Sequence, residues 1–169
     1  MSDLTLKRDE RGASGPSHRP PTPSPPDPLW RTPQFRRVED QRFLMMERAY
    51  SRSGGIASGD EVARLLRRRS EQPISKLARW IVARVVVNFE WQSQTLLPLF
   101  QFDLSDMSLH PGTVQVIEEL SDVFDDWDLA SWFASPNSWL QDATPAEAIR
   151  HSQPSVLRAA RADRFIAHG

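Results

Sequence analysis

Cysteine is absent from the 169-residue sequence, and glycine occurs only seven times. Without cysteine no disulfide can form, and a zinc site would have to use histidine and carboxylate ligands alone. None of the four histidines lies within ligand-like spacing of another. The motifs of phosphate-binding loops, serine hydrolases and zinc proteases are missing as well. We therefore expect no bound metal, no cofactor and no enzymatic activity.

Long apolar runs are also absent. The most apolar stretch, residues 80–89, is short and contains Arg84, so it is not expected to span a bilayer. The charged start of the chain, MSDLTLKRDERGASG, lacks the apolar block that a secretory signal needs. We expect a cytoplasmic protein with no membrane partner.

Charge is distributed unevenly along the chain, although the formal net charge is only -1. Residues 52–84 contain eight Lys or Arg and three acidic residues, whereas residues 103–147 contain ten acidic residues and no Lys or Arg. After residue 147 the chain carries four Arg and one Asp. A charged run is often no more than a solvated face, but this separation favours two partners of different charge.

Proline marks the first expected boundary. Eight of the 14 prolines lie between Pro16 and Pro33, where they favour extended polyproline geometry. We expect residues 1–34 to form a disordered proline-rich arm. The rest of the chain is expected to fold in two parts, residues 35–102 and residues 103–169. Its periodicities predict a mainly α fold with a small β-hairpin.

Three helices are predicted in the first of these parts. Residues 36–51 carry apolar side chains at helical spacing, and Met45 and Met46 are expected to fill the core. Ser58 and Glu61 have the spacing of a capping box, and Pro73 suits the first turn of the helix after it. The positions expected to face the core are Phe43, Met46, Ala49 and Tyr50, then Val62, Leu65 and Leu66, and finally Ile74, Leu77 and Ile81.

Residues 85–91 and 96–102 are rich in β-branched and aromatic residues and predict a hairpin, in which Pro98 marks the second strand as an edge. Two helices followed by a hairpin are the outline of a winged helix-turn-helix, whose second helix enters the major groove of DNA. The alternative is two packed helices with a solvated basic face. The absence of cations from residues 92–95, where a DNA-contacting wing usually carries them, favours an interaction adaptor whose helix-turn-helix has decayed. The residues expected to contact DNA are Arg67, Arg68, Arg69, Ser75, Lys76, Arg79 and Arg84.

The second half is predicted to be helical, from the apolar spacing of residues 114–124 to a last helix over residues 154–166. Thr144 and Glu147 form a second capping box, with Pro145 in the first helical position. Four aromatic residues lie between Trp127 and Trp139; most are expected in the core, and one or two at an interface. The acidic run over residues 118–128 lacks the glycine and the alternating carboxylates of a calcium-binding loop.

The stretch WFASPNSWLQDATPAEAI, residues 132–149, resembles the signature of the Xre/MbcA/ParS-type toxin-binding domain family. In that family an aromatic-rich helix is followed by a Pro-Asn turn, a Leu, a glycine-rich step and a Thr-Pro that opens a helix. Gln141 and Asp142 replace the usual glycine here, and Asp tolerates left-handed geometry better than most residues. The upstream segment is similar to that of family members with a divergent N-terminal DNA-binding module. The residues at the signature positions are Trp132, Pro136, Asn137, Leu140, Thr144 and Pro145.

This resemblance implies an antitoxin of a type II toxin–antitoxin system. Such proteins bind a cognate toxin, often an NAD-consuming or ADP-ribosylating enzyme, through the C-terminal domain, and they commonly bind their own operator DNA. The resemblance implies toxin contacts by the signature residues, to which we add Trp139, and at the C-terminal end by Arg161, Arg164 and Phe165. Alternatively, Phe165 and Ile166 close the protein's own core. An orphan transcriptional regulator, an interaction adaptor without a toxin and a homodimer remain open.

Overall fold

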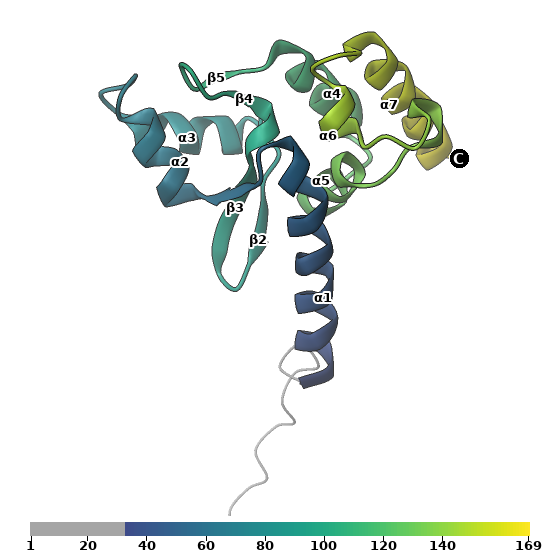
Figure 1. The fold of residues 1–169 in the computed structure, drawn as a ribbon, viewed down its shortest axis with the longest axis horizontal. Coiled ribbons are helices and arrows are strands. Elements are labelled where there is room, and N and C mark those ends of the chain that lie inside the picture. The colour runs from purple at the N-terminus through teal and green to yellow at the C-terminus, as the bar shows by residue number, and fades with distance from the viewer. Residues whose placement is uncertain (1–32) are drawn as a thin grey trace, which may run out of the picture.

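Residues 33–169 are described by the computed structural model in Figure 1. The expected proline-rich arm, residues 1–34, lies outside these residues except for its last two positions. The described chain is mostly helical and has a small antiparallel sheet. None of its helices is long and apolar enough to cross a membrane.

The elements have the following bounds. The helices are α1 (Pro33–Tyr50), α2 (Gly59–Leu66), α3 (Pro73–Val82), α4 (Pro111–Leu120), α5 (Asp126–Ala134), α6 (Pro145–Ala148) and α7 (Gln153–His168). The strands are β1 (Ile56–Ser58), β2 (Phe89–Trp91), β3 (Gln94–Pro98), β4 (Phe102–Asp103) and β5 (Ser108–Leu109). Single 3-10 turns are η2 (Ser51–Ser53), η3 (Leu99–Gln101) and η4 (Ser138–Leu140).

The main sheet has the strand order β1-β3-β2, and both pairs of strands are antiparallel. Gln92 and Ser93 connect β2 to β3 with positive φ, as a tight two-residue hairpin turn requires. The sequence predicted this hairpin but not β1, because three residues are too few to show strand alternation. With β1 in place, β3 is the central strand. The prediction that Pro98 marks an edge strand is therefore wrong: Pro98 ends β3, opposite Ile56.

Helices α2 and α3 begin as their caps predict. The Ser58 side chain accepts a hydrogen bond from the Glu61 amide, and the Glu61 carboxylate accepts one from the Ser58 amide at 2.8 Å. Leu77 of α3 is buried, but Ile74 is 68% exposed, so the prediction that Ile74 faces the core is wrong. The buried arc of α3 is centred near Leu77, and Ile74 lies beyond its margin on the helical wheel. Leu65 is likewise exposed on α2.

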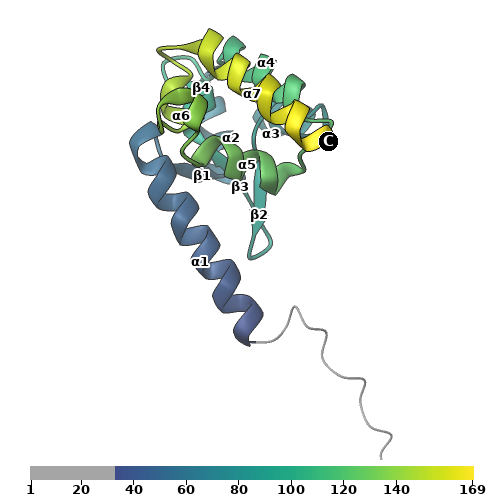
Figure 2. The same cartoon turned by 90° about the vertical axis from the view of Figure 1, so that its right-hand side faces the viewer.

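In the second half, α7 packs along α4, and the two helices lie side by side in both Figure 1 and Figure 2. α7 also contacts η4 and α6, so the chain segments on both sides of residue 140 are tied to the last helix. Strands β4 and β5 form a short antiparallel ladder that the sequence did not predict. The last helix was predicted over residues 154–166, in agreement with α7.

One buried apolar cluster joins the two halves of the chain. It combines residues of α1 and the sheet with residues of α4, α5, α6 and α7. At its centre the Tyr50 hydroxyl donates a hydrogen bond to the Ala130 carbonyl at 2.6 Å. A second, smaller cluster lies under α2 and α3 and includes Phe102 and Met107. The core thus crosses the boundary expected at residue 102.

Helix α1 projects away from the rest of the described chain in Figures 1 and 2. Its C-terminal part is anchored, because Met46 is buried and Phe43 stacks on Trp91 with ring centroids 3.9 Å apart. Met45 is 69% exposed, so the prediction that it fills the core is wrong. Consecutive side chains diverge by about 100° around a helix, which places the two methionines on different faces.

Candidate functional site

The two helices α2 and α3 and the turn that connects them carry a basic surface. Within it, Arg69 donates a hydrogen bond to the Ser105 carbonyl at 3.0 Å, and the Lys76 ammonium lies 4.9 Å from the centre of the Trp80 ring. Ser75 and Arg79 are exposed on α3. The structure therefore brings together six of the seven residues expected to contact DNA. The cations of the basic surface are Arg64, Arg67, Arg68, Arg69, Lys76 and Arg79.

One flank of the exposed face of α3 is apolar, and Ser75 and Arg79 lie at the centre of that face, opposite Leu77. Ile74, Ala78 and Val82 recur every four residues and are exposed, with Val82 at 84%. We call these three residues the α3 stripe; Ser75 and Arg79 lie beside it on the same exposed arc. Sequence reasoning missed the stripe because it assigned apolar residues of α3 to the core. The spacing of Ala78 and Val82 was the available signal.

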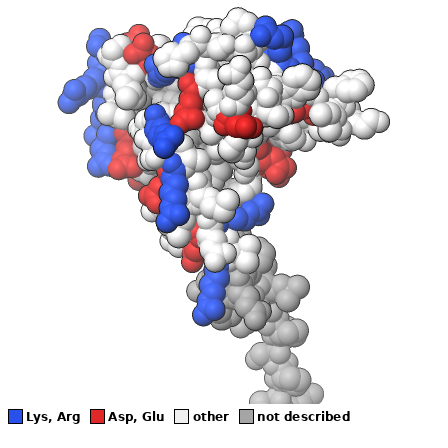
Figure 3. Space-filling model, turned by 45° about the vertical axis from the view of Figure 1, so that its right-hand side comes forward, with Lys and Arg blue, Asp and Glu red and all other residues white. Residues whose placement is uncertain are grey.

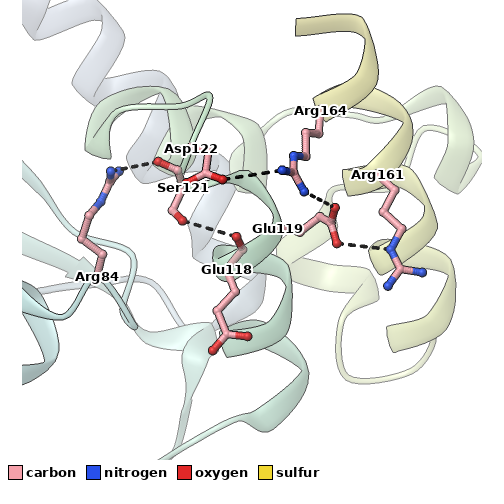
Figure 4. A network of polar contacts seen from close by, with 7 residues as sticks. All are labelled: Arg84, Glu118, Glu119, Ser121, Asp122, Arg161 and Arg164. Carbon is pink, nitrogen blue, oxygen red and sulfur yellow. Dashed lines mark hydrogen bonds and ion pairs between the residues drawn. The ribbon is translucent and has the colours of Figure 1, made fainter. Parts of the chain in front are cut away.

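Arg84 does not belong to the basic surface. Its guanidinium donates hydrogen bonds to the carbonyls of Ser121 at 3.0 Å and Phe124 at 2.9 Å, and it lies 3.3 Å from the Asp126 carboxylate. Arg84 thus connects the end of α3 to the corner between α4 and α5 (Figure 4). Arg84 therefore lies apart from the other residues expected to contact DNA, and its backbone is left-handed at the point where the chain leaves α3.

The signature residues of the second half meet at Asp163 of α7. One carboxylate oxygen of Asp163 accepts hydrogen bonds from the Trp132 indole at 2.7 Å and from the Asn137 amide at 2.8 Å. Asn137 is buried, and its side-chain oxygen accepts from the Trp139 amide, so the Pro-Asn turn is held on both sides. The sequence did not reveal Asp163, because it lies 31 residues from Trp132 and no local pattern links them.

The turn after this motif is left-handed at two successive residues. Gln141 has φ +58 and Asp142 has φ +64, at the positions where the resembling family carries glycine. Thr144 then caps α6, since its hydroxyl accepts from the Glu147 amide at 3.3 Å. Leu140 and Pro145 are buried, whereas Pro136 is exposed and Trp139 is 63% exposed. Of the six signature residues and Trp139, only Pro136 and Trp139 are therefore highly exposed.

Helix α7 is joined to α4 by ion pairs, which Figure 4 shows from close by. Glu119 accepts from Arg164 at 2.9 Å and from Arg161 at 3.2 Å, and Arg164 also lies 3.5 Å from Asp122. The hydrogen bond from Arg164 holds the pKa of Glu119 below its usual range. The guanidinium groups of Arg161 and Arg164 are thus engaged within the chain. Beyond them, Phe165 is 82% and Ile166 is 69% exposed, so these two side chains do not close the core.

The acidic residues of the second half do not form one continuous acidic surface. Figure 3 shows acidic side chains scattered among uncharged and basic ones on the face it presents. Many of them support local structure: hydrogen bonds from Ser105 and Ser108 lower the pKa values of Asp103 and Asp106, and Asp125 caps α5. The residues with such local partners are Asp103, Asp106, Glu119, Asp122, Asp125, Asp126 and Glu147.

The fold and these surfaces define a mainly helical protein with a small antiparallel sheet, a basic surface on α2 and α3, and exposed aromatic residues on its C-terminal helices. No protein-family model, curated protein or solved structure matches this chain. Within residues 33–169, no group of three His, Asp or Glu side chains is placed to hold a metal ion.

Proposed function

We propose that this protein is a cytoplasmic antitoxin that binds operator DNA through a winged helix-turn-helix and binds a cognate toxin through its C-terminal helices. One observation carries the DNA-binding part. The elements follow one another as α1-β1-α2-α3-β2-β3. Strand β1 pairs with β3, the second strand of the hairpin, which gives the sheet order β1-β3-β2. A helix pair followed by such a hairpin presents its second helix outward, which is the geometry that helix-turn-helix proteins insert into the major groove.

Electrostatics supports the same assignment. The basic surface occupies the two helices and the turn that would face the duplex, and contacts between cations and phosphates supply most sequence-independent affinity for DNA. Arg67 and Arg68 are exposed at the turn, and Arg79 is exposed on α3, so these three can reach phosphates without breaking an ion pair in the described chain.

The toxin-binding part rests on the signature and its geometry. The two left-handed residues, Gln141 and Asp142, stand where the family's glycine would allow the same turn. Asp163 fixes Trp132 and Asn137, so that Pro136 and Trp139 are presented on a preformed surface, and Phe165 is exposed separately on α7. Preformed aromatic side chains are effective interface anchors, because little conformational entropy is lost when they bind. An NAD-consuming or ADP-ribosylating enzyme is the proposed partner.

The DNA-binding part is tested with DNA from upstream of the protein's own gene. We expect a mobility shift at low salt that weakens steeply as salt is added. Replacing Arg67, Arg68 and Arg79 with Ala should lower the slope of log K against log salt by about 0.9 per lost phosphate contact. The matched control replaces the exposed Arg48, Arg52 and Arg158, which changes net charge equally and should leave the slope near the wild-type value. No shift with wild-type protein would contradict DNA binding.

The toxin-binding part is tested by co-expression with the product of the neighbouring gene. We expect the two proteins to co-purify and the cells to survive, and Trp139→Ala to weaken both effects while the fold stays intact. An orphan regulator would bind DNA but give no rescue. An interaction adaptor would do neither, and the cation-free hairpin tip at Gln92 and Ser93 favours that alternative. The two experiments together separate the three functions.

A further inference from the structure

The α3 stripe is an apolar surface on a helix that is otherwise well packed. Ile74 is 68% and Val82 is 84% exposed, and Ala78 lies between them at the helical spacing of four residues. Leu77, about 100° around the helix from Ala78, is buried and anchors α3 to the second core cluster. Leu77 is the one buried side chain of α3, and within residues 33–169 the stripe lies outside the packed face of the helix.

The surroundings of the stripe define the charge of that partner. Arg79 lies beside it on α3. Arg64 and Arg67 line the same surface depression as Ile74, together with Glu47, Asp60 and Glu61, and Arg64 lies 4.0 Å from the Glu61 carboxylate. Positive charge prevails at the α2–α3 turn, where Arg67 and Arg68 are exposed, and beside the stripe at Arg79. The surface therefore suits a partner that carries negative charge next to apolar groups within a groove.

Duplex DNA has this combination in its major groove. The phosphates are negative, and the thymine C5-methyl is the apolar group that a base pair presents there. At a rise of about 1.5 Å per residue, the stripe from Ile74 to Val82 is about 12 Å long, or three to four base-pair steps of about 3.4 Å. Side chains four residues apart lie about 6 Å apart along the helix axis, close to two base-pair steps, so the three apolar side chains match methyl groups on alternate base pairs.

We propose that the α3 stripe reads thymine methyl groups, so that the protein selects DNA with thymine at alternate base pairs of each contacted major groove. Arg79 and Ser75, beside the stripe, supply hydrogen bonds to base edges or phosphates at its border. This inference rests on the proposed DNA-binding function and adds the sequence class that it recognises.

The test compares two forms of one DNA fragment, the region upstream of the protein's gene, prepared with either thymidine or deoxyuridine. The two forms have the same sequence and hydrogen-bonding edges and differ in the C5-methyl groups. Burial of one methyl group corresponds to roughly a four-fold change in affinity. We expect the uracil form to bind at least about ten-fold more weakly, because several methyl contacts are lost together.

Variants separate methyl contact from a change in DNA stiffness. The double variant Ile74→Ser and Val82→Ser should bind both forms with nearly equal affinity, whereas Val38→Ser, an exposed valine on α1, should keep the full preference for thymine. Equal binding of both forms by wild-type protein would overturn the proposal while leaving DNA binding intact. Binding to neither form would overturn DNA binding itself. A double variant that keeps the thymine preference but loses self-association or toxin binding would assign the stripe to a protein interface instead.

Discussion

Tyr50 is the only tyrosine of the chain, and it is fully buried at the point where α1 meets α5. Its hydroxyl donates to the Ala130 carbonyl, and burial raises the phenol pKa well above the usual 10.0. The folded state therefore favours the neutral phenol. The free energy of unfolding is therefore unaffected by Tyr50 ionisation below pH 10. It falls as pH rises above 10, because the phenol then ionises in the unfolded chain but not in the folded one.

We predict that the ultraviolet absorbance of tyrosinate appears only together with unfolding when the protein is titrated to alkaline pH. Tyr50→Phe should lower the free energy of unfolding at neutral pH by about 1 kcal/mol, because the hydrogen bond from the phenol hydroxyl to the Ala130 carbonyl is lost. The same variant should be less sensitive to alkaline pH than wild type. Smooth tyrosinate formation in the folded protein near pH 10 would show that the side chain is not enclosed.

Gln141 and Asp142 store strain in the turn before α6, since both have left-handed backbone geometry that costs a residue with a Cβ about 1–2 kcal/mol. We predict that Gln141→Gly raises the free energy of unfolding by up to about 1 kcal/mol, measured by urea denaturation. The control is Gln94→Gly, at an exposed strand position with ordinary φ, which should destabilise by about 0.5–1 kcal/mol. Destabilisation by both substitutions would mean that the Gln141 side chain makes a contact outweighing its backbone strain.

Helix starts were predicted correctly from neighbouring residues, whereas features that depend on contacts between distant segments were not predicted. The caps at Ser58, Pro73 and Thr144 were readable because a cap needs only neighbouring residues. Strands β1, β4 and β5 were missed, since two or three residues carry no periodicity. The exposure of Ile74 and the role of Asp163 depend on packing between segments far apart in the sequence. The sequence therefore predicted candidate-site residues on caps and helix faces, but it did not predict the residues that contact them in the fold.

Arg84 links two elements that the sequence placed in different parts of the chain. We predict that Arg84→Ala lowers the free energy of unfolding by about 1–2 kcal/mol, because two carbonyls at the α4–α5 corner lose their donor. Arg79→Ala, at an exposed position of α3, should change stability by less than about 0.5 kcal/mol.

In DNA binding the order of the two variants should be reversed: Arg79→Ala should have the larger effect and Arg84→Ala the smaller. Arg79→Ala is expected to reduce the salt slope by about 0.9, and Arg84→Ala to leave it unchanged at temperatures where the protein stays folded. If Arg84→Ala reduced the salt slope of DNA binding without changing stability, Arg84 would be a DNA-contacting residue after all.

At the scale of the whole molecule, the strong charge separation of the sequence is partly cancelled by folding. Arg84 of the basic segment pairs with Asp126, and the basic last helix pairs with Glu119 and Asp122 of the acidic segment. These contacts, together with the shared core, join the halves into one unit. The charge distribution along the sequence therefore overestimated both the extent of the acidic surface and the number of cations of α7 that have no acidic partner among the described residues.

This arrangement changes how the C-terminal end should be tested. Truncation after Ala160 removes Asp163 and the two arginines that pair with Glu119, and it leaves the buried Asn137 amide without its acceptor. Such a chain should be destabilised by several interactions at once, at about 1–3 kcal/mol for the unpaired buried amide alone. Loss of toxin binding would then follow from unfolding and would say nothing about contact.

Truncation after Arg164 is the informative variant, because it removes the exposed Phe165 and Ile166 and keeps every ion pair of α7 with α4. We predict a change in the free energy of unfolding below about 0.5 kcal/mol. Rescue of cells from the co-expressed toxin should nevertheless fall sharply, since two large apolar side chains leave the proposed interface. Leu104→Ser, which removes an exposed apolar side chain of β4–β5, should keep full rescue. Full rescue by the truncated chain would exclude the tail from the interface, and lost folding would show that the tail supports the core despite its exposure.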